Sequence, residues 1–491
     1  MNILMLSNSA PNYHHFFKVL VSLFVKNGAK AVVAVDSAFS RSENKLDELN
    51  VKEIYEFAAF FRNHITDHSM LARYADFNLN AALLSDFERA QTYNIWGGHT
   101  NVEYFDRLKS ALLSFYEMIF EMHQTDMVLY ENVSNSFAHF ALFVAQRKGK
   151  TYLGLGGSRL PGRFSVSSDP VKDDTVAKAF EAIRAGQLTP DTQVRYWARA
   201  YIDGIETIVP DYMKINGLDQ LALTKRYLRR DRIMKIVALL RYAADSRTDA
   251  FQIGNPLLTH LALFRRNLDR RFRSGKVRKL YQNPVAGERF ILYPLHFHPE
   301  SSTSILAGAW LNEYEVIRNV AFNLPEGIKL YVKDHISAWA FPDLDFYRRL
   351  LALPNVRLLP PEAPTKKLIR CSEAVITLTS TVGYEALLLK RRVFLFGEVF
   401  YAFHKGVTRV GNPAKLHDFL RTQLARPVDW DDTYNEDFVC AYHASTYSET
   451  LNLLLGPVEA RETAERIYTV LTTGNGILSN RPTHETVNNG Y

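Results

Sequence analysis

Apolar runs alternate with amphipathic segments in the first third of the chain. The runs NILMLS (2–7) and AVVAVD (31–36) are typical of buried strands. Residues 16–28 between them have apolar positions at helical spacing and end in a glycine. DMVLYE (126–131) is a further strand, and a helical segment and another strand follow it. This alternation predicts a doubly wound parallel sheet over residues 1–165.

The same alternation returns after a long helical interval. Residues 166–285 are rich in arginine and lack strand patterns, so we expect a basic helical insertion or bridge there. Strand and helix patterns then alternate over 286–445, which predicts a second Rossmann-like domain. C-terminal helices are expected at 446–472 and a loose polar tail at 473–491. The predicted fold class is therefore α/β, with two Rossmann-like domains facing a cleft.

Composition supports a large cytoplasmic protein with several domains. A chain of 491 residues is too long for one ordinary core, and 47% hydrophobic with 23% charged residues is a globular profile. Cys371 and Cys440 are too few for a disulfide framework and argue against a Cys-ligated metal site. The N-terminus lacks the features of a signal peptide, and no apolar run is long enough for a membrane span.

The strongest candidate site is the segment 374–401, where a buried strand ends at hydroxyl residues. Ser380 and Thr381 stand between this strand and a helix, Gly383 lets the chain turn closely, and Glu385 lies in the first helical turn. Hydroxyls and backbone N–H groups at a helix start bind phosphate well, and Glu385 can accept hydrogen bonds from ribose. The alternative is an ordinary capping box.

Charged groups at a second strand end form another candidate site. In KLYVKDH, Lys333 and His335 stand where open α/β sheets bind ligands, and a cation there would stabilise a leaving phosphate. The alternative is a surface loop of mixed charge.

His296, His298 and Glu300 follow a third strand. We expect these three residues to contact the donor sugar or base. No metal is predicted, because two histidines at i, i+2 have no Cys or third His close by.

The N-terminal half supplies a carboxylate and two arginines. Glu131 ends the strand DMVLYE, so it is a candidate base or nucleophile facing a cleft. Ser158, Arg159 and Arg163 follow in GGSRLPGRF, and arginines can bind a sugar carboxylate bidentately. The alternatives are a capping glutamate and loop arginines.

Together these strings resemble the bacterial capsule polysaccharide biosynthesis proteins, a family that includes retaining β-Kdo transferases using CMP-Kdo. The strings that carry the resemblance are PLHFHPESSTS, LYVKDH, PNVRLLPPEAPTKKLI, ITLTSTVGYEALLLKRRVFLFGEVFY and, more weakly, LYENVSN and GGSRLPGRF. The resemblance implies a GT-B fold, no metal or other cofactor, a CMP-linked acidic donor, and a phosphate site made by His335 with Ser380 and Thr381. Ile336 stands where the family usually has a proline after the histidine.

The resemblance also implies a carboxylate in the cleft. Glu131 is the candidate by position, as nucleophile of a retaining reaction or base of an inverting one, with Asp126, Asp169 and Glu300 as rivals. The expected function is metal-independent transfer of Kdo or another ulosonic acid onto a surface polysaccharide, lipopolysaccharide or other glycolipid acceptor.

Other functions fit the same patterns. The alternatives are a UDP- or GDP-sugar GT-B transferase, an enzyme similar to UDP-GlcNAc 2-epimerase, a CDP-polyol phosphotransferase, and a non-catalytic glycan-assembly subunit.

Charge predicts a membrane partner. The net charge is +7, yet residues 225–279 hold 16 Lys/Arg against 4 Asp/Glu, or +12. The default is a solvated helix face, and nucleic acid ranks last because no nucleic-acid motif accompanies the charge. With a lipid-linked or anionic acceptor, we expect salt-sensitive, peripheral association with the cytoplasmic face of an anionic inner membrane, without insertion. The expected contacts are Arg229, Arg230, Arg232, Arg265, Arg266, Arg270, Arg271 and Arg273.

Overall fold

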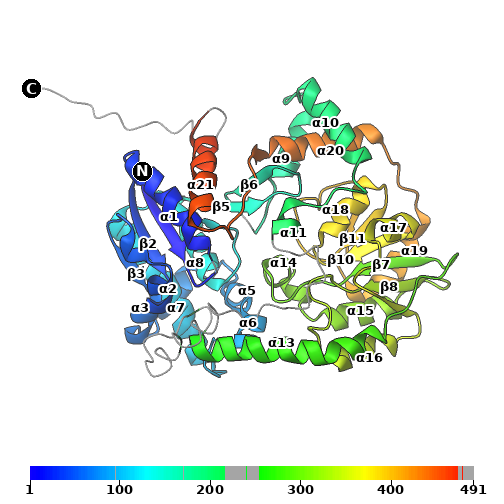
Figure 1. Cartoon of the computed structure of the whole chain (residues 1–491), viewed down its shortest axis with the longest axis horizontal. Helices are drawn as coiled ribbons and strands as arrows, with labels where there is room; N and C mark the ends of the chain where they lie inside the picture. The colour runs from blue at the N-terminus through cyan, green and yellow to red at the C-terminus, as the bar shows by residue number, and fades with distance from the viewer. Residues whose placement is uncertain are drawn as a thin grey trace, which may run out of the picture.

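The computed structural model describes residues 1–215 and 254–473 apart from Pro11, Asn94 and Pro170, together with Leu239, Phe251 and Leu478. Figure 1 shows two α/β lobes side by side, the N-terminal one in blue and cyan and the C-terminal one in colours from green through yellow to orange. A long helix, α13 (Pro256–Arg278), runs along both lobes.

The first lobe is built on a seven-stranded sheet of order β13-β6-β5-β4-β1-β2-β3. Its strands are β1 (Asn2–Ser7), β2 (Lys30–Val35), β3 (Ile54–Glu56), β4 (Met127–Glu131), β5 (Thr151–Gly157), β6 (Arg163–Ser167) and β13 (Thr446–Ser448). β1 to β5 pair in parallel, while β6 and β13 add an antiparallel edge. The helices of this lobe are α1 (Tyr13–Lys26), α2 (Ala38–Glu43), α3 (Phe57–Asn63), α4 (His68–Arg73), α5 (Leu79–Leu84), α6 (Phe87–Tyr93), α7 (Val102–His123) and α8 (Ser136–Arg147).

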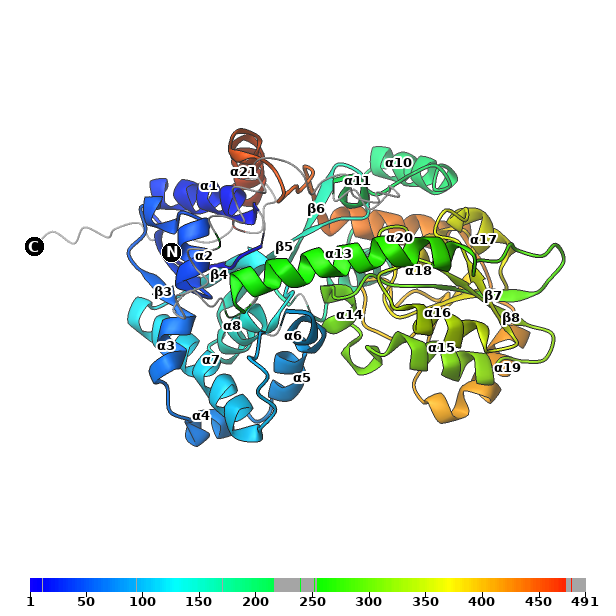
Figure 2. The same ribbon diagram turned by 60° about the horizontal axis from the view of Figure 1, so that its bottom comes forward.

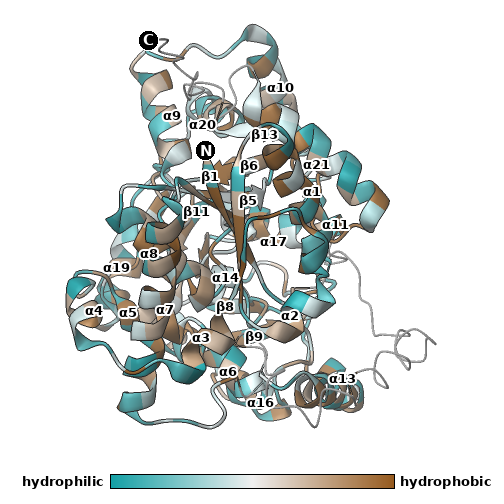
Figure 3. Cartoon of the chain, turned by 90° about the vertical axis from the view of Figure 1, so that its left-hand side faces the viewer, coloured by the Kyte–Doolittle hydropathy of each residue, from teal (hydrophilic) through white to brown (hydrophobic). Residues whose placement is uncertain are grey.

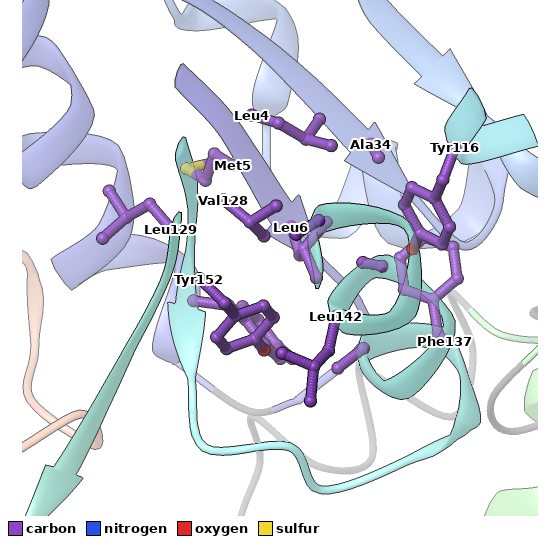
Figure 4. Packing of buried hydrophobic residues seen from close by; sticks show 14 of the residues in the cluster. Leu4, Met5, Leu6, Ala34, Tyr116, Val128, Leu129, Phe137, Leu142 and Tyr152 are labelled. Atoms are coloured by element: carbon purple, nitrogen blue, oxygen red, sulfur yellow. The ribbon is translucent and has the colours of Figure 1, made fainter. Parts of the chain in front are cut away.

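The core of this lobe lies between the parallel strands and their covering helices. Leu4, Leu6 and Val128 are fully buried on the strands, and Tyr116 and Phe137 pack on them from α7 and α8 (Figure 4). Both faces of a parallel sheet are covered by helices, which is why these strands are apolar throughout. Figure 3 shows the same contrast, with hydrophobic central strands and more hydrophilic outer helices.

The second lobe has a six-stranded, fully parallel sheet of order β12-β11-β10-β7-β8-β9. Its strands are β7 (Phe290–Pro294), β8 (Lys329–Lys333), β9 (Val356–Leu359), β10 (Ala374–Thr377), β11 (Arg392–Leu395) and β12 (Val407–Arg409). The helices are α14 (Ser301–Ser304), α15 (Glu313–Phe322), α16 (Leu344–Leu351), α17 (Thr365–Cys371), α18 (Thr381–Leu388) and α19 (Leu416–Ala425).

The remaining segments connect the lobes. The bridge contains α9 (Thr175–Arg184), α10 (Thr192–Asp203), α11 (Asp211–Ile215) and α13. α20 (Asp432–Ala444) packs against α9 and α10, after which the chain returns to the first lobe, where α21 (Pro457–Thr472) packs against α1. Both α20 and α9 lie above the second sheet in Figure 1.

Two local predictions differ from the structure. β6 begins before and ends after the boundary expected at residue 165, since its pairing with β5 extends the first sheet. The segment expected to be helical from 446 starts instead with β13, and its helix begins at Pro457. β13 is only three residues long, too short to show an alternating pattern, and its pairing with β6 decides its conformation.

The basic bridge is only partly described. Arg229, Arg230 and Arg232 lie outside the described residues, and Arg265 and Arg271 are exposed on α13. Arg266 and Arg270 were expected to face a membrane, and this is wrong. Arg266 donates to the carbonyl oxygen of His298 at 3.0 Å, and the Arg270 guanidinium is buried and donates to that of Trp339 at 2.8 Å.

Candidate functional site

In each of the two sheets, the order of the strands reverses at one point. Running from the edge inward, β3, β2 and β1 come before β4 and β5 in the first sheet, and β9, β8 and β7 come before β10 and β11 in the second. The direction of chain progression therefore switches between β1 and β4 and again between β7 and β10. In open α/β sheets, ligands bind outside the carboxyl ends of the strands at such a point.

A cavity of about 990 Å³ lies at both reversal points. Residues that follow β1 and β4 line it from the first lobe, and residues that follow β7 and β10 line it from the second. Nine of the expected site residues line this cavity, namely Glu131, Arg159, His296, Glu300, Lys333, His335, Ser380, Thr381 and Glu385. Polar groups predicted from segments far apart in the sequence therefore share one space.

The start of α18 presents hydroxyl groups to the cavity. Ser380 is the N-cap of this helix, and its Oγ accepts a hydrogen bond from the backbone N–H of Val382 at 3.1 Å. Because Oγ accepts in this bond, its own O–H stays available as a donor to a ligand. The backbone N–H of Ser380 donates to Oγ1 of Thr377 at 3.1 Å, which fixes the turn between β10 and α18.

Gly383 has a packing role here, which differs from the expected contact with phosphate. It is buried, it does not line the cavity, and a Cβ at its position would lie 2.5 Å from the Tyr401 hydroxyl oxygen. That hydroxyl donates to the carbonyl oxygen of Ser380 at 2.6 Å. The glycine therefore admits the ring that supports the turn.

Lys333 and Asp334 are neighbouring buried residues at the end of β8, and each has its own hydrogen-bond partners. Lys333 Nζ donates to the carbonyl oxygen of Pro361 at 2.9 Å, and burial lowers the pKa of this lysine to about 8. Asp334 accepts from the Tyr281 hydroxyl at 2.6 Å and from the backbone N–H of His335 at 2.7 Å. Burial raises the pKa of Asp334 to about 6, although these bonds favour its ionised form.

His335 is held in one tautomer. Its Nδ1 accepts a hydrogen bond from the backbone N–H of Ser337 at 3.2 Å, so the proton of the neutral ring is on Nε2. Burial, with the positive charge of Lys333, lowers the pKa of His335 to about 4. His335 therefore offers a neutral N–H donor, and a bound phosphate would raise this pKa again.

Glu131 is the carboxylate of the first lobe at the cavity. It ends β4, and its Oε1 accepts from the Ser134 hydroxyl at 2.8 Å. Burial raises the pKa of Glu131 to about 7, against the opposing effects of Ser134 and the positive charge of Arg89. A carboxyl group with this pKa exchanges a proton readily near neutral pH.

The rival carboxylates are placed differently. Glu300 lines the cavity, burial raises its pKa, and its side chain also caps α14. Asp126 lies at the opposite end of β4, where it accepts from the backbone N–H of Asn2 at 2.9 Å. Asp169 accepts from two backbone N–H groups of its own loop. Only Glu131 and Glu300, of these four, lie at the cavity.

The two histidines after β7 belong to a buried network. His296 Nδ1 lies 2.7 Å from Oε1 of Glu313, and its Nε2 accepts from the backbone N–H of Thr379 at 3.4 Å. His298 does not line the cavity, contrary to expectation; its Nδ1 lies 2.9 Å from Glu88 of α6 in the other lobe. Burial opposes its charge, yet the bonds to Glu313 and Glu88 raise the pKa of His298 to about 10. His298 therefore ties the two lobes together as a cation.

Of the residues that follow β5, one lines the cavity and two form hydrogen bonds within the protein. Arg159 lines the cavity, whereas Arg163 turns away from it and donates from Nε to Oγ1 of Thr446 at 2.8 Å. Ser158 is buried, and its Oγ accepts from the backbone N–H of Leu160 at 3.0 Å. Ser158 and Arg163 therefore hold β6 and β13 in place, which differs from the expected contact with a sugar.

Sequence reasoning missed several cavity residues. Arg89 of α6 donates to Asp86 at 2.9 Å and brings a positive charge close to Glu131. Lys366 of α17 donates to the carbonyl oxygens of Ile205 and Ile208, so it holds the bridge segment against the cavity. Arg89 lies in an ordinary helical segment that gives no signal. Lys366 lies in the string PTKKLI, where the basic pair was the available signal.

The described part of the chain contains no group of three or more His, Cys, Asp or Glu side chains arranged to hold a metal ion. Nor does any helix within that part have the length and apolar character needed to cross a membrane.

Two Rossmann-like lobes with a shared cavity, and a C-terminal helix that crosses back to the first lobe, define the GT-B fold, so the predicted fold class is confirmed. Residues 242–427 match the family described as capsule polysaccharide biosynthesis protein, which confirms the predicted resemblance for that part of the chain.

Several solved structures are similar over most of this chain. The β-Kdo 2,7 transferase of KpsC from Thermosulfurimonas dismutans is 11% identical, with a TM-score of 0.35, and covers 72% of this chain and 89% of its own. The β-Kdo 2,4 transferase of the same protein is 15% identical, with a TM-score of 0.36 and coverage of 70% and 87%. UDP-GlcNAc 2-epimerase from Neisseria meningitidis is 12% identical, with a TM-score of 0.30 and coverage of 96% and 100%. No curated protein matches the chain.

Proposed function

We propose that this protein is a glycosyltransferase that moves an acidic sugar, Kdo or another ulosonic acid, from a CMP-linked donor to a surface polysaccharide or glycolipid acceptor. One observation carries the proposal. A single cavity joins a carboxylate of the first lobe, Glu131, to hydroxyl and imidazole donors of the second lobe. This is the pairing of catalytic carboxylate and phosphate site that sugar transfer from a nucleotide needs.

The donor phosphate would bind at the start of α18. The free O–H of Ser380 and the Nε2–H of His335 are donors at this end of the cavity, and Lys333 adds positive charge close by. Fixed donors around a phosphate stabilise the charge that develops on it as the bond to the sugar breaks. Glu385, which also lines the cavity, would accept from ribose hydroxyls.

The sugar carboxylate would bind at the first lobe. Arg159 and Arg89 line the cavity from this side, and an arginine binds a carboxylate through two parallel hydrogen bonds. Two arginines on this side of the cavity favour an acidic donor sugar over a neutral one, because only the acidic sugar supplies a carboxylate for them to bind.

Glu131 would carry the transfer. In a retaining reaction its ionised carboxylate attacks the anomeric carbon, and CMP leaves with the electron pair of the broken C–O bond. The acceptor hydroxyl then attacks that carbon, loses its proton, and displaces the carboxylate. In an inverting reaction Glu131 instead takes the proton of the acceptor hydroxyl during a single displacement. The anomeric configuration of the product distinguishes the two reactions.

Turnover separates this proposal from its alternatives. The test incubates the protein with CMP-Kdo and a Kdo-terminated glycolipid acceptor and measures both CMP release and acceptor mass. An added Kdo residue on the acceptor supports the proposal. Release of UDP or GDP from UDP- or GDP-sugars alone would indicate a different GT-B transferase. Epimerisation of UDP-GlcNAc would indicate an epimerase, and transfer from a CDP-polyol would indicate a phosphotransferase. Absence of nucleotide binding in a thermal-shift assay with CMP, CDP, UDP and GDP would point to a non-catalytic subunit.

A further inference from the structure

α13 carries an apolar stripe on the side that faces away from the protein. The stripe consists of Leu258, Leu261, Leu268 and Phe272, with 59%, 53%, 42% and 72% of their surface exposed. The buried residues of the helix are Pro256, Thr259, Arg270 and Val277. At about 100° per residue, the centre of the stripe lies roughly opposite the centre of the buried side. A helix that packs on one side and is solvated on the other would have polar residues at these positions.

Positive charge flanks this stripe. α13 contains seven Lys/Arg residues and one acid, Asp269. Arg265, Arg271 and Lys276 are exposed beside the stripe, and none of them forms an ion pair with another described residue. Arg266 and Arg270 point to the opposite side, where each lies over the ring of Phe341 at 4.5 and 4.2 Å. Of the other two cations, Arg273 is half-buried and Arg278 pairs with Glu362 at 3.0 Å. The helix therefore leaves three exposed cations without an ion pair among the described residues, against one exposed acid, Asp269.

α13 is fixed to both lobes and lies on the outside of the molecule. It packs against α6 of the first lobe and α16 of the second. Figure 2, in which the bottom of Figure 1 comes forward, shows α13 in front of both lobes along its whole length. Its 23 residues correspond to about 35 Å of rigid, exposed helix.

We propose that α13 is an interfacial helix that docks this protein on an anionic membrane, with Leu258, Leu261, Leu268 and Phe272 inserted among the lipids. Helices that lie in the plane of a membrane surface have apolar side chains on one face, with cations close to them. Charge decides against a second copy of the chain as the occupant, because two such faces would bring their cations together.

The attachment of α13 also links the membrane to the cavity. Arg266 holds the carbonyl of His298, and the next two residues, Pro299 and Glu300, line the cavity. A docked α13 would keep the cavity close to the lipid surface. This link rests on the proposed function, where it would favour acceptors carried on lipid, whereas membrane docking itself is measured without any sugar substrate.

The test is binding of the full-length protein to vesicles of phosphatidylglycerol with phosphatidylcholine, or of phosphatidylcholine alone. We expect binding to the anionic vesicles only. L258Q/L261Q/L268Q/F272Q should bind them at least about tenfold more weakly, because burial of the four side chains is lost. R265Q/R271Q/K276Q should bind the anionic vesicles roughly fivefold more weakly for each cation removed, and the difference should be smaller at high salt. The matched control, I65Q/V102Q/M122Q, removes exposed apolar side chains of the first lobe and should bind as wild type.

Insertion is measured with F272W and F322W, which add one tryptophan each to the same native background. Brominated lipids should quench F272W more than F322W, since Phe322 is 69% exposed on α15 and away from the stripe. Three results would overturn the proposal: equal quenching of F272W and F322W, wild-type binding by L258Q/L261Q/L268Q/F272Q, or no binding of the wild-type protein at low salt. A dimer in solution that L258Q/L261Q/L268Q/F272Q abolishes would assign the stripe to self-association instead.

Discussion

The two halves of the cavity are constructed in different ways. In the second lobe, the cavity residues follow the ends of adjacent strands in short strings, and backbone groups orient them, as Ser337 orients His335. In the first lobe, the charged cavity residues come from separate elements, with Arg89 on α6, Glu131 at the end of β4 and Arg159 after β5. The second-lobe groups therefore stand at strand ends that the sequence reveals, whereas the position of Arg89 depends on how α6 packs.

This difference follows from what each half recognises. A phosphate is a compact anion with the same shape in every nucleotide, and one strand-turn-helix unit surrounds it well. A sugar and an acceptor are larger and vary between enzymes, so their contacts come from several loops on a common scaffold. We therefore expect variants of the second lobe to change nucleotide affinity, and variants of the first lobe to change turnover.

The largest effect is expected for E131Q. The amide can neither attack the anomeric carbon nor accept the acceptor proton, so kcat should fall by about 10³-fold or more. CMP affinity and melting temperature should stay close to wild type, since the phosphate site is in the other lobe. The measurement is CMP release with CMP-Kdo and acceptor.

The control for this variant is E300Q, which changes the other carboxylate at the cavity. If E300Q abolished turnover while E131Q retained it, the catalytic carboxylate would have to be reassigned to the second lobe, and the comparison of the two halves would fail.

The next effect is on nucleotide affinity. S380A/T381A removes two hydroxyl donors, and a hydrogen bond to a charged group contributes roughly 1.5–3 kcal/mol. If only one of the two hydroxyls contacts the phosphate, CMP should bind about 10- to 100-fold more weakly by calorimetry. The control is S22A/T433A, two exposed hydroxyls away from the cavity, which should leave CMP affinity unchanged. Unchanged CMP affinity in a folded S380A/T381A protein would show that the phosphate does not bind at this turn.

The same comparison explains what the sequence could reveal. Both sheets follow from runs such as NILMLS and RFILYPL, because parallel strands buried on both faces are apolar throughout. Ser380 and His335 could be found because each stands at the end of such a run. Arg89 could not, because its role depends on where α6 packs. His298 and Arg163 were misplaced because their partners, Glu88 and Thr446, are 210 and 283 residues away in the sequence.

A smaller effect concerns pH. Glu131 has a pKa of about 7, raised by burial, and both proposed reactions need its ionised form. kcat/KM should therefore rise with pH up to about 7 and fall roughly tenfold for each unit below it. S134A removes the hydrogen bond that favours the carboxylate, so the midpoint should move to higher pH. A profile that is flat from pH 5 to 8 would exclude ionisation of Glu131 as a requirement.

The smallest effect concerns Gly383, and it separates the packing of the turn between β10 and α18 from its binding of phosphate. G383A should destabilise the protein by roughly 1–3 kcal/mol, because the new Cβ would lie 2.5 Å from the Tyr401 hydroxyl oxygen. G411A is the matched control, since a Cβ there meets nothing within 4 Å, and its melting temperature should not fall. Y401F should recover part of the loss in G383A by removing the oxygen that collides. CMP affinity should change less in G383A than in S380A/T381A, because Gly383 supports the turn without lining the cavity. A G383A protein of normal melting temperature that no longer binds CMP would restore this glycine to the phosphate site.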